Sequence, residues 1–125
     1  MPISYEIDEA RGLVHTTASG TLTDSDILQL KARLVADPRW RSTMRELSDV
    51  RAIDKLEVTA EGVQSMMLRD QSDAAALASY RLAIVVSKEV AYGMARMYQI
   101  LTERTVPHVG VFRDMEEARS WLGVN

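Results

Sequence analysis

The chain contains no cysteine, and this absence removes several kinds of chemistry at once. Disulfide bonds, thiolate metal sites and cysteine nucleophiles are all excluded. No apolar run approaches the roughly 20 residues that a membrane-spanning helix needs. The first residues, Met1–Glu6, lack the basic and apolar segments of a signal peptide. Together these absences are typical of a cytoplasmic protein.

Strong net charge and glycine-rich loops are also missing. The net charge of −3 creates no global field that would attract nucleic acid or an anionic membrane. The six glycines form no phosphate-binding loop, and no repeat, linker or low-complexity tract interrupts the sequence. The 125 residues therefore predict a single domain, 1–125, that is long enough to form a core without disulfides or a structural metal.

Hydrophobic periodicity predicts an α/β protein with the element order β-β-α-β-α-β-α-β-α. The short turn Glu9–Gly12 makes the first two strands an antiparallel hairpin. The later strands alternate with helices, which is typical of parallel strands covered by helices. The expected strands are Ile3–Asp8, Leu13–Thr21, Thr43–Val50, Arg81–Ser87 and Val106–Phe112, and the expected helices are Thr23–Asp37, Thr59–Leu77, Glu89–Arg104 and Asp114–Leu122.

Several local features carry further expectations. The unbroken apolar run Leu82–Val86 predicts a strand buried on both faces in a central position. In the first helix, the apolar positions from Ile27 to Val35 are expected to form the buried stripe, with Lys31 and Arg33 outside it. The segment Arg51–Val58 has mixed polarity and is expected to be an irregular connection.

The helix Glu89–Arg104 is unusually rich in methionine and tyrosine. Helical spacing places Val90, Met94, Met97, Tyr98 and Leu101 on one buried face, while Tyr92 and Ile100 lie off it. A helix that is apolar around more than half of its circumference needs a second apolar contact. We therefore take the following as a candidate surface for a partner protein or an apolar ligand, against the alternative of ordinary core packing: Tyr92, Met94, Arg96, Met97 and Tyr98.

The ends of the expected parallel strands form a second candidate site. Ligands of open parallel sheets bind outside the carboxyl ends of the strands, where this chain places Asp49, Arg51, Ser87 and Lys88. These polar side chains would serve a small enzyme if they converged in a cleft. The alternative is structural, with Asp49 and Arg51 forming an ion pair and Ser87 capping the next helix.

Neither the histidines nor the arginine cluster defines a site. His15 and His108 have no carboxylate or histidine at metal-ligand spacing, so we expect no metal and no cofactor. Arg39, Arg41 and Arg45 flank Trp40 and could contact phosphate groups, but the acidic net charge argues against nucleic acid as a partner.

Several segments resemble the STAS fold of bacterial anti-sigma-factor antagonists and, within it, the SpoIIAA-like proteins. These segments are Gly20–Thr23, Glu46–Arg51, Arg81–Val86, Tyr92–Met97 and Val111–Leu122. The resemblance implies a small non-enzymatic domain that binds protein partners or, as is thought for some relatives, lipid-like ligands. Antagonists carry an Asp-Ser-x-Gly segment after the third strand, but here Asp54 is followed by Lys55, so no phosphoacceptor is carried over.

The sequence therefore predicts a STAS-like binding or regulatory domain that contacts a partner protein or an apolar, lipid-like small molecule through the helix Glu89–Arg104. Formation of a homodimer through the same helix is a related hypothesis, because small soluble oligomers are most often two-fold symmetric. The alternative from another class is a small enzyme that uses the polar groups at the strand ends.

Overall fold

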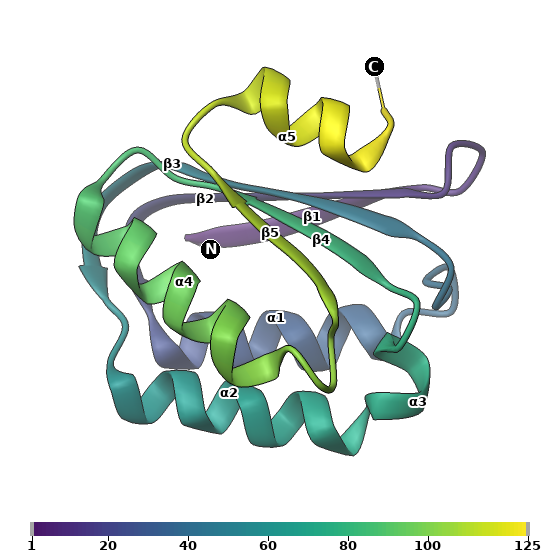
Figure 1. Cartoon of the computed structure of the whole chain (residues 1–125), viewed down its shortest axis with the longest axis horizontal. Coiled ribbons are helices and arrows are strands. Elements are labelled where there is room, and N and C mark those ends of the chain that lie inside the picture. The colour runs from purple at the N-terminus through teal and green to yellow at the C-terminus, as the bar shows by residue number, and fades with distance from the viewer. Residues whose placement is uncertain (1, 125) are drawn as a thin grey trace.

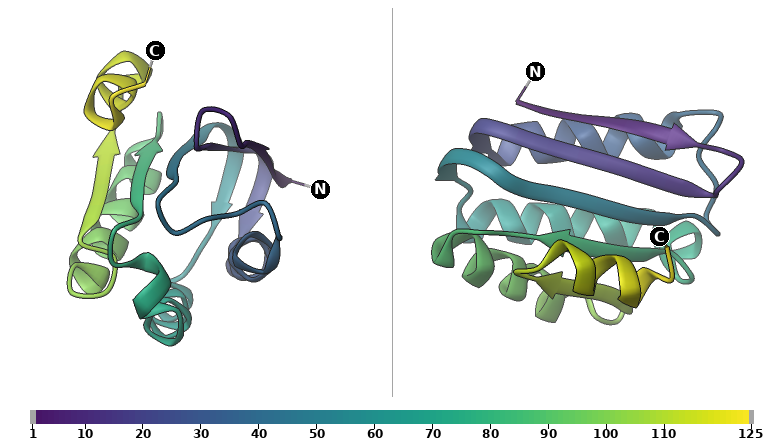
Figure 2. Two further views of the ribbon diagram at one scale, coloured as in Figure 1. Left: turned by 90° about the vertical axis from the view of Figure 1, so that its right-hand side faces the viewer. Right: turned by 90° about the horizontal axis from the view of Figure 1, so that it is seen from above.

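The apolar strands of the sequence form a five-stranded sheet in the computed structural model, which describes residues 2–124. The strands lie in the order β1-β2-β3-β4-β5, with β1 and β2 antiparallel and all later neighbours parallel (Figure 2). Met1 and Asn125, the two ends of the expected domain, lie outside the described residues. The elements are β1 Ile3–Asp8, β2 Leu13–Thr23, α1 Asp24–Ala36, β3 Arg45–Glu57, α2 Ala60–Ser72, α3 Ala74–Leu77, β4 Arg81–Val85, α4 Glu89–Thr102, β5 His108–Phe112 and α5 Met115–Leu122.

The helices form unequal layers on the two faces of the sheet. Helices α1, α2 and α4 lie on one face and α5 lies on the other (Figure 1). Helix α2 is farther from the sheet than its neighbours and packs between α1 and α4 (Figure 2). Val63 and Met66 are the buried apolar residues that α2 directs into the core. The main core therefore has three helical walls and a sheet as its floor.

The predicted fold class is confirmed, with five helices rather than four between residues 2 and 124. The expected helix Thr59–Leu77 is interrupted at Asp73, whose backbone (φ −109°, ψ 19°) leaves the helical region. Asp73 also forms an ion pair with Arg69 at 3.2 Å. Because aspartate prefers helix ends to helix interiors, α2 ends at Ser72 and the short helix α3 starts at Ala74.

The prediction for Arg51–Val58 is wrong, because β3 continues through this segment to Glu57. Its pairing with β2 shifts twice, so β3 holds one extra residue at each shift. As a result Val50, Ile53 and Leu56, which are three residues apart, all pack in the same apolar cluster. The two bulges remove the alternation by which a strand is recognised in a sequence.

Strand β4 lies between β3 and β5, so it is interior but one place from the central strand β3. Ala83 and Val85 face α5, and Leu82 faces the larger helical layer. Five boundaries differ by two residues from those expected, since β2 ends at Thr23, β3 starts at Arg45, β4 ends at Val85, α4 ends at Thr102 and β5 starts at His108. Helix α5 is capped by Asp114 and followed by Gly123 in the left-handed conformation.

Candidate functional site

Three of the four polar residues predicted at the strand ends are hydrogen-bonded to one another, and none of the four lines the pocket in the main core. Asp49 and Arg51 form a bidentate ion pair with two distances of 2.9 Å, and the hydrogen bonds from Arg51 hold the pKa of Asp49 below its ordinary value against the opposing effect of burial. Ser87 donates a hydrogen bond to the carbonyl oxygen of Arg51 at 3.0 Å, so it does not cap α4. The residue at the N-cap of α4 is Lys88, which is exposed.

The five candidate residues of α4 separate into two groups. Met94 and Tyr98 face an internal cavity, whereas Met97 is half-buried against the core outside the cavity. Tyr92 lies under the guanidinium of Arg113, 3.8 Å from the ring centroid. Arg96 is exposed and donates a hydrogen bond to Gln99.

The expected buried face of α4 is rotated in the structure. Val90 is 67% exposed and Leu101 is 40% exposed, although the helical spacing places both inside. The residues of α4 that are fully buried are Ala91, Tyr98 and Thr102. The small side chain of Ala91 packs in the core at the first turn of α4, and Val90 beside it points toward solvent.

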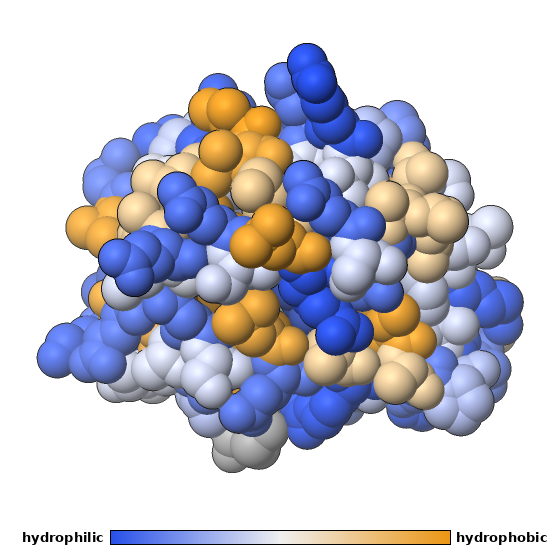
Figure 3. Space-filling view, turned by 90° about the horizontal axis from the view of Figure 1, so that it is seen from below, coloured by the Kyte–Doolittle hydropathy of each residue, from blue (hydrophilic) through white to orange (hydrophobic). Residues whose placement is uncertain are grey.

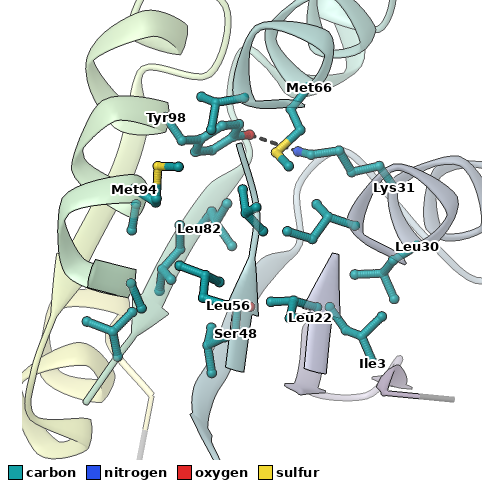
Figure 4. A pocket seen from close by; sticks show the side chains of 18 of the residues that line it. Ile3, Leu22, Leu30, Lys31, Ser48, Leu56, Met66, Leu82, Met94 and Tyr98 are labelled. Atoms are coloured by element: carbon teal, nitrogen blue, oxygen red, sulfur yellow. Dashed lines mark hydrogen bonds between the residues drawn. The ribbon is translucent and has the colours of Figure 1, made fainter. Parts of the chain in front are cut away.

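The cavity lies between the sheet and the helices α1, α2 and α4, and its volume is about 150 Å³. Figure 4 shows side chains from all these elements pointing toward a shared space. Most of the lining is aliphatic, and four lining residues carry polar or charged groups, namely Lys31, Glu46, Ser48 and Tyr98.

Lys31 belongs to a buried network at one end of the cavity. Its Nζ lies 3.1 Å from Oδ1 of Asp70 and 2.9 Å from the hydroxyl of Tyr98, and that hydroxyl donates to Oδ2 of Asp70 at 2.5 Å. Burial alone would lower the pKa of Lys31, but the attraction of Tyr98 and Asp70 outweighs it and raises the pKa. Burial, with the charge of Asp70 added, raises the pKa of Tyr98. At neutral pH the network is therefore an ammonium–carboxylate pair joined by a neutral phenol.

Glu46 lies beside this network on β3. Its two carboxyl oxygens accept hydrogen bonds from the hydroxyls of Thr16, at 2.9 Å, and Tyr80, at 2.8 Å. Burial raises the pKa of Glu46, and the two hydrogen bonds oppose this effect only in part. Each carboxyl oxygen therefore accepts one hydrogen bond, and the group lacks a cation in direct contact among the described residues.

Ser48 and Ile84 show that the cavity reaches the middle of the sheet. They are directly paired on the interior strands β3 and β4, yet both are only half-buried. Both residues line the cavity. Neighbouring strands cover their edges and α4 covers their face, so the exposed area of these two side chains borders the cavity.

Sequence reasoning missed most of the polar residues of this site. The prediction that Lys31 lies outside is wrong, although its spacing from Ile27 and Leu34, four residues earlier and three later, already placed it on the buried face. Glu46 and Ser48 alternate with Leu47 and share a face of β3 with the buried Val50. Asp70 gave no signal, because a charged residue on a helix is normally solvated.

The arginines around Trp40 are committed to contacts within the chain. Arg39 pairs with Asp37 at 2.9 Å, and Arg45 donates to the carbonyl oxygens of Leu122 and Gly123. Arg41 donates to the carbonyl oxygen of Glu9. Between residues 2 and 124 no group of three or more histidine, aspartate or glutamate side chains is arranged to hold a metal ion.

No family model and no curated protein matches the chain. The chain is similar to the crystal structure of an uncharacterised protein of the DUF3478 family with a SpoIIAA-like fold, from Shewanella loihica PV-4. The TM-score is 0.59 at 19% sequence identity, over 96% of this chain and 93% of that one. The chain therefore has a SpoIIAA-like fold, and the resemblance found in the sequence is confirmed for the fold. None of its helices between residues 2 and 124 combines the length and hydropathy required to cross a bilayer.

Proposed function

We propose that the protein is a non-enzymatic binding domain that takes up a small apolar molecule in the cavity beside α4. The observation that carries this proposal is the cavity of about 150 Å³ in the main core. Protein interiors contain few voids larger than a water molecule. Apolar side chains around such a space lack the packing contacts that they would make in a filled core. A ligand would restore those contacts.

The size of the cavity limits the ligand. An engineered cavity of about 150 Å³ in another protein binds benzene or xenon, so the volume of this cavity matches one six-membered ring or a short branched chain. A full-length acyl chain would require the walls to move apart. We therefore narrow the lipid-like ligand expected from the sequence to a molecule of about the size of toluene.

The carboxyl ends of β3 and β4 form the side on which the ligand would enter. Leu56, Val58 and Ala95 line this side of the cavity and are half-buried, whereas Leu30, Leu34 and Met66 are buried. This position agrees with the general preference of ligands for the carboxyl ends of parallel strands. The proposed function is binding without chemistry, since Lys31, Asp70 and Tyr98 are already engaged with one another.

The methionines provide a direct test of this proposal. Met66 and Met94 line the cavity, while Met67 and Met97 lie on the same helices outside its lining. In protein labelled with ¹³C at the methionine methyl groups, we expect toluene to shift the first two signals and leave the second two unchanged. Uniform shifts, or none, would contradict a ligand in this cavity.

A matched pair of alanine substitutions provides the control. Ala95→Leu adds a larger side chain to the cavity lining, and Ala75→Leu makes the same change at an exposed position in α3. We expect Ala95→Leu to weaken toluene binding at least tenfold and Ala75→Leu to leave it unchanged. Equal affinities in the two variants would show that toluene binds elsewhere.

A second candidate function is contact with a partner protein through the outer surface of α2 and α4. Four large apolar side chains are exposed there: Leu68 at 61%, Val90 at 67%, Ile100 at 57% and Leu101 at 40%. Figure 3 shows the underside of the molecule, where hydrophobic groups alternate with charged ones. If a second copy of the chain covers this surface, sedimentation will show a dimer that Val90→Ser with Ile100→Ser dissociates. A monomer at all concentrations would exclude that homodimer.

A further inference from the structure

The polar end of the cavity restricts the chemical class of the ligand. Lys31 and Tyr98 lie at that end and Ser48 lies on the floor (Figure 4). A purely apolar cavity selects by size and shape, but buried polar groups also disfavour any ligand that leaves them without hydrogen bonds. The charges at the cavity and the hydrogen-bonding groups that lack a partner therefore decide which ligands fit.

The local charge excludes an anionic ligand. The single positive charge at the cavity, on Lys31, is neutralised by Asp70 at 3.1 Å. The remaining titratable group, Glu46, adds either no charge or a negative one. A carboxylate ligand would therefore meet no unpaired cation and would lose its hydration. A cationic ligand would also lose its hydration, and the lining offers it one carboxyl group, Glu46, whose two oxygens each already accept one hydrogen bond, from Thr16 and Tyr80.

Hydrogen-bonding capacity nevertheless remains at the cavity. The three N–H donors of Lys31 are all directed at acceptors within the network, since both carboxylate oxygens of Asp70, at 3.1 and 3.3 Å, and the hydroxyl of Tyr98, at 2.9 Å, accept from them. The remaining capacity therefore belongs to Ser48. The hydroxyl of Ser48 has no hydrogen bond to another residue in the range 2–124, and it is not among the fully buried polar atoms, so it borders accessible space. A polar site of this kind holds water in solution. A wholly apolar ligand would displace that water without replacing its hydrogen bonds.

We propose that the cavity selects an uncharged, single-ring molecule with one hydroxyl group, which lies against the hydroxyl of Ser48. This inference rests on the proposed function and specifies its ligand. The aliphatic lining contacts the ring, while the hydroxyl both donates and accepts, as Ser48 does. Phenol is the simplest probe of this class, and toluene is its apolar isostere.

The test measures four dissociation constants at pH 7.5 from the methyl signals of Met66 and Met94, using toluene, phenol, benzoate and benzylammonium. An apolar cavity would favour toluene, because phenol loses the hydration of its hydroxyl on entering. We expect phenol to bind at least as tightly as toluene, and both ions at least tenfold more weakly than phenol. Toluene binding more tightly than phenol, or either ion binding within tenfold of it, would overturn the inference. Failure of all four probes would overturn the proposed function as well.

Substitution of Ser48 tests where the hydroxyl lies. Ser48→Ala removes one hydroxyl from the cavity, and Ser4→Ala removes one from the exposed side of β1. We expect Ser48→Ala to weaken phenol binding about tenfold, which corresponds to about 1.4 kcal/mol, and to change toluene binding less than twofold. Ser4→Ala should change neither. Equal effects of Ser48→Ala on both probes would remove Ser48 from the proposed site.

Discussion

Replacing Lys31 by methionine should destabilise the protein strongly, because it leaves the carboxylate of Asp70 buried without its cation. The two groups lie 3.1 Å apart, and their side chains are 19% and 4% exposed. At an effective dielectric constant of about 20, unit charges at that distance attract by roughly 5 kcal/mol. Breaking a buried pair from one side costs about 3–5 kcal/mol. We expect a loss in this range for Lys31→Met.

The measurement is urea unfolding followed by the fluorescence of Trp40 and Trp121. The midpoint should fall without a change in the slope, which reports the surface exposed on unfolding. Lys55→Met is the matched control, because Lys55 pairs with Glu57 at the surface with its side chain 70% exposed. Its effect should stay below about 1 kcal/mol.

Replacing the whole network tests the reasoning more sharply. The triple variant Lys31→Met, Asp70→Leu and Tyr98→Phe removes both charges and the hydroxyl that joins them. Apolar replacements of a buried ion pair are often neutral or stabilising, so the triple variant should regain most of the stability that Lys31→Met loses. If Lys31→Met costs less than about 1 kcal/mol, or if the triple variant is no more stable than the single one, the buried pair does not act as described.

Two further predictions concern Glu46 and Gly62. Burial raises the pKa of Glu46 above its ordinary value near 4.5. The stability that the protonated carboxyl group contributes is therefore complete below about pH 4.5 and is lost as the pH rises through the pKa of the folded state. The loss is about 1.4 kcal/mol for each unit by which folding raises this pKa. Urea unfolding at pH 5 and pH 8 should therefore show a smaller decline for Glu46→Gln than for the natural chain, and parallel profiles would contradict the assignment. Gly62→Ala places a Cβ atom against the carboxylate of Asp24 and should lower the free energy of unfolding by about 1–3 kcal/mol. At Gly93, also in a helix, the added Cβ atom would lie in open space, so Gly93→Ala should raise the free energy of unfolding by about 0.4–1 kcal/mol. Thermal unfolding of both variants checks the contrast, and equal shifts would contradict it.

Most of the fold could be predicted because its determinants are local. Short segments each specify an element or its end within a few residues: the run Leu82–Val86, the turn at Glu9–Gly12 and the caps at Thr23 and Asp114. The extension of β3 could not be predicted in the same way. Its two bulges depend on how β3 pairs with β2, and the spacing of Val50, Ile53 and Leu56 alone resembles neither a regular strand nor a regular helix.

The candidate site was predictable only where apolar side chains define it. Met94 and Tyr98 were identified from the composition of α4, and both line the cavity. Lys31 and Asp70 are 39 positions apart in the chain, and either one alone is typical of a solvated helix surface. Burial of the two charged groups is favourable only because α1 and α2 bring them into contact. This contact depends on how far α2 lies from the sheet, and no segment of the sequence specifies that distance by itself.

The two extra residues of β3 make this strand sensitive to the number of its residues as well as to their identity. Substitutions at exposed positions such as Asp54 and Lys55 leave the spacing of the strand intact. Deleting either residue would instead leave Ile53 and Leu56 in regular pairing with Gly20 and Leu22, and β3 would lose the bend and the added twist that a bulge gives a strand at this edge of the cavity. Related chains that keep this cavity should therefore vary freely in the side chains of this segment while conserving its length.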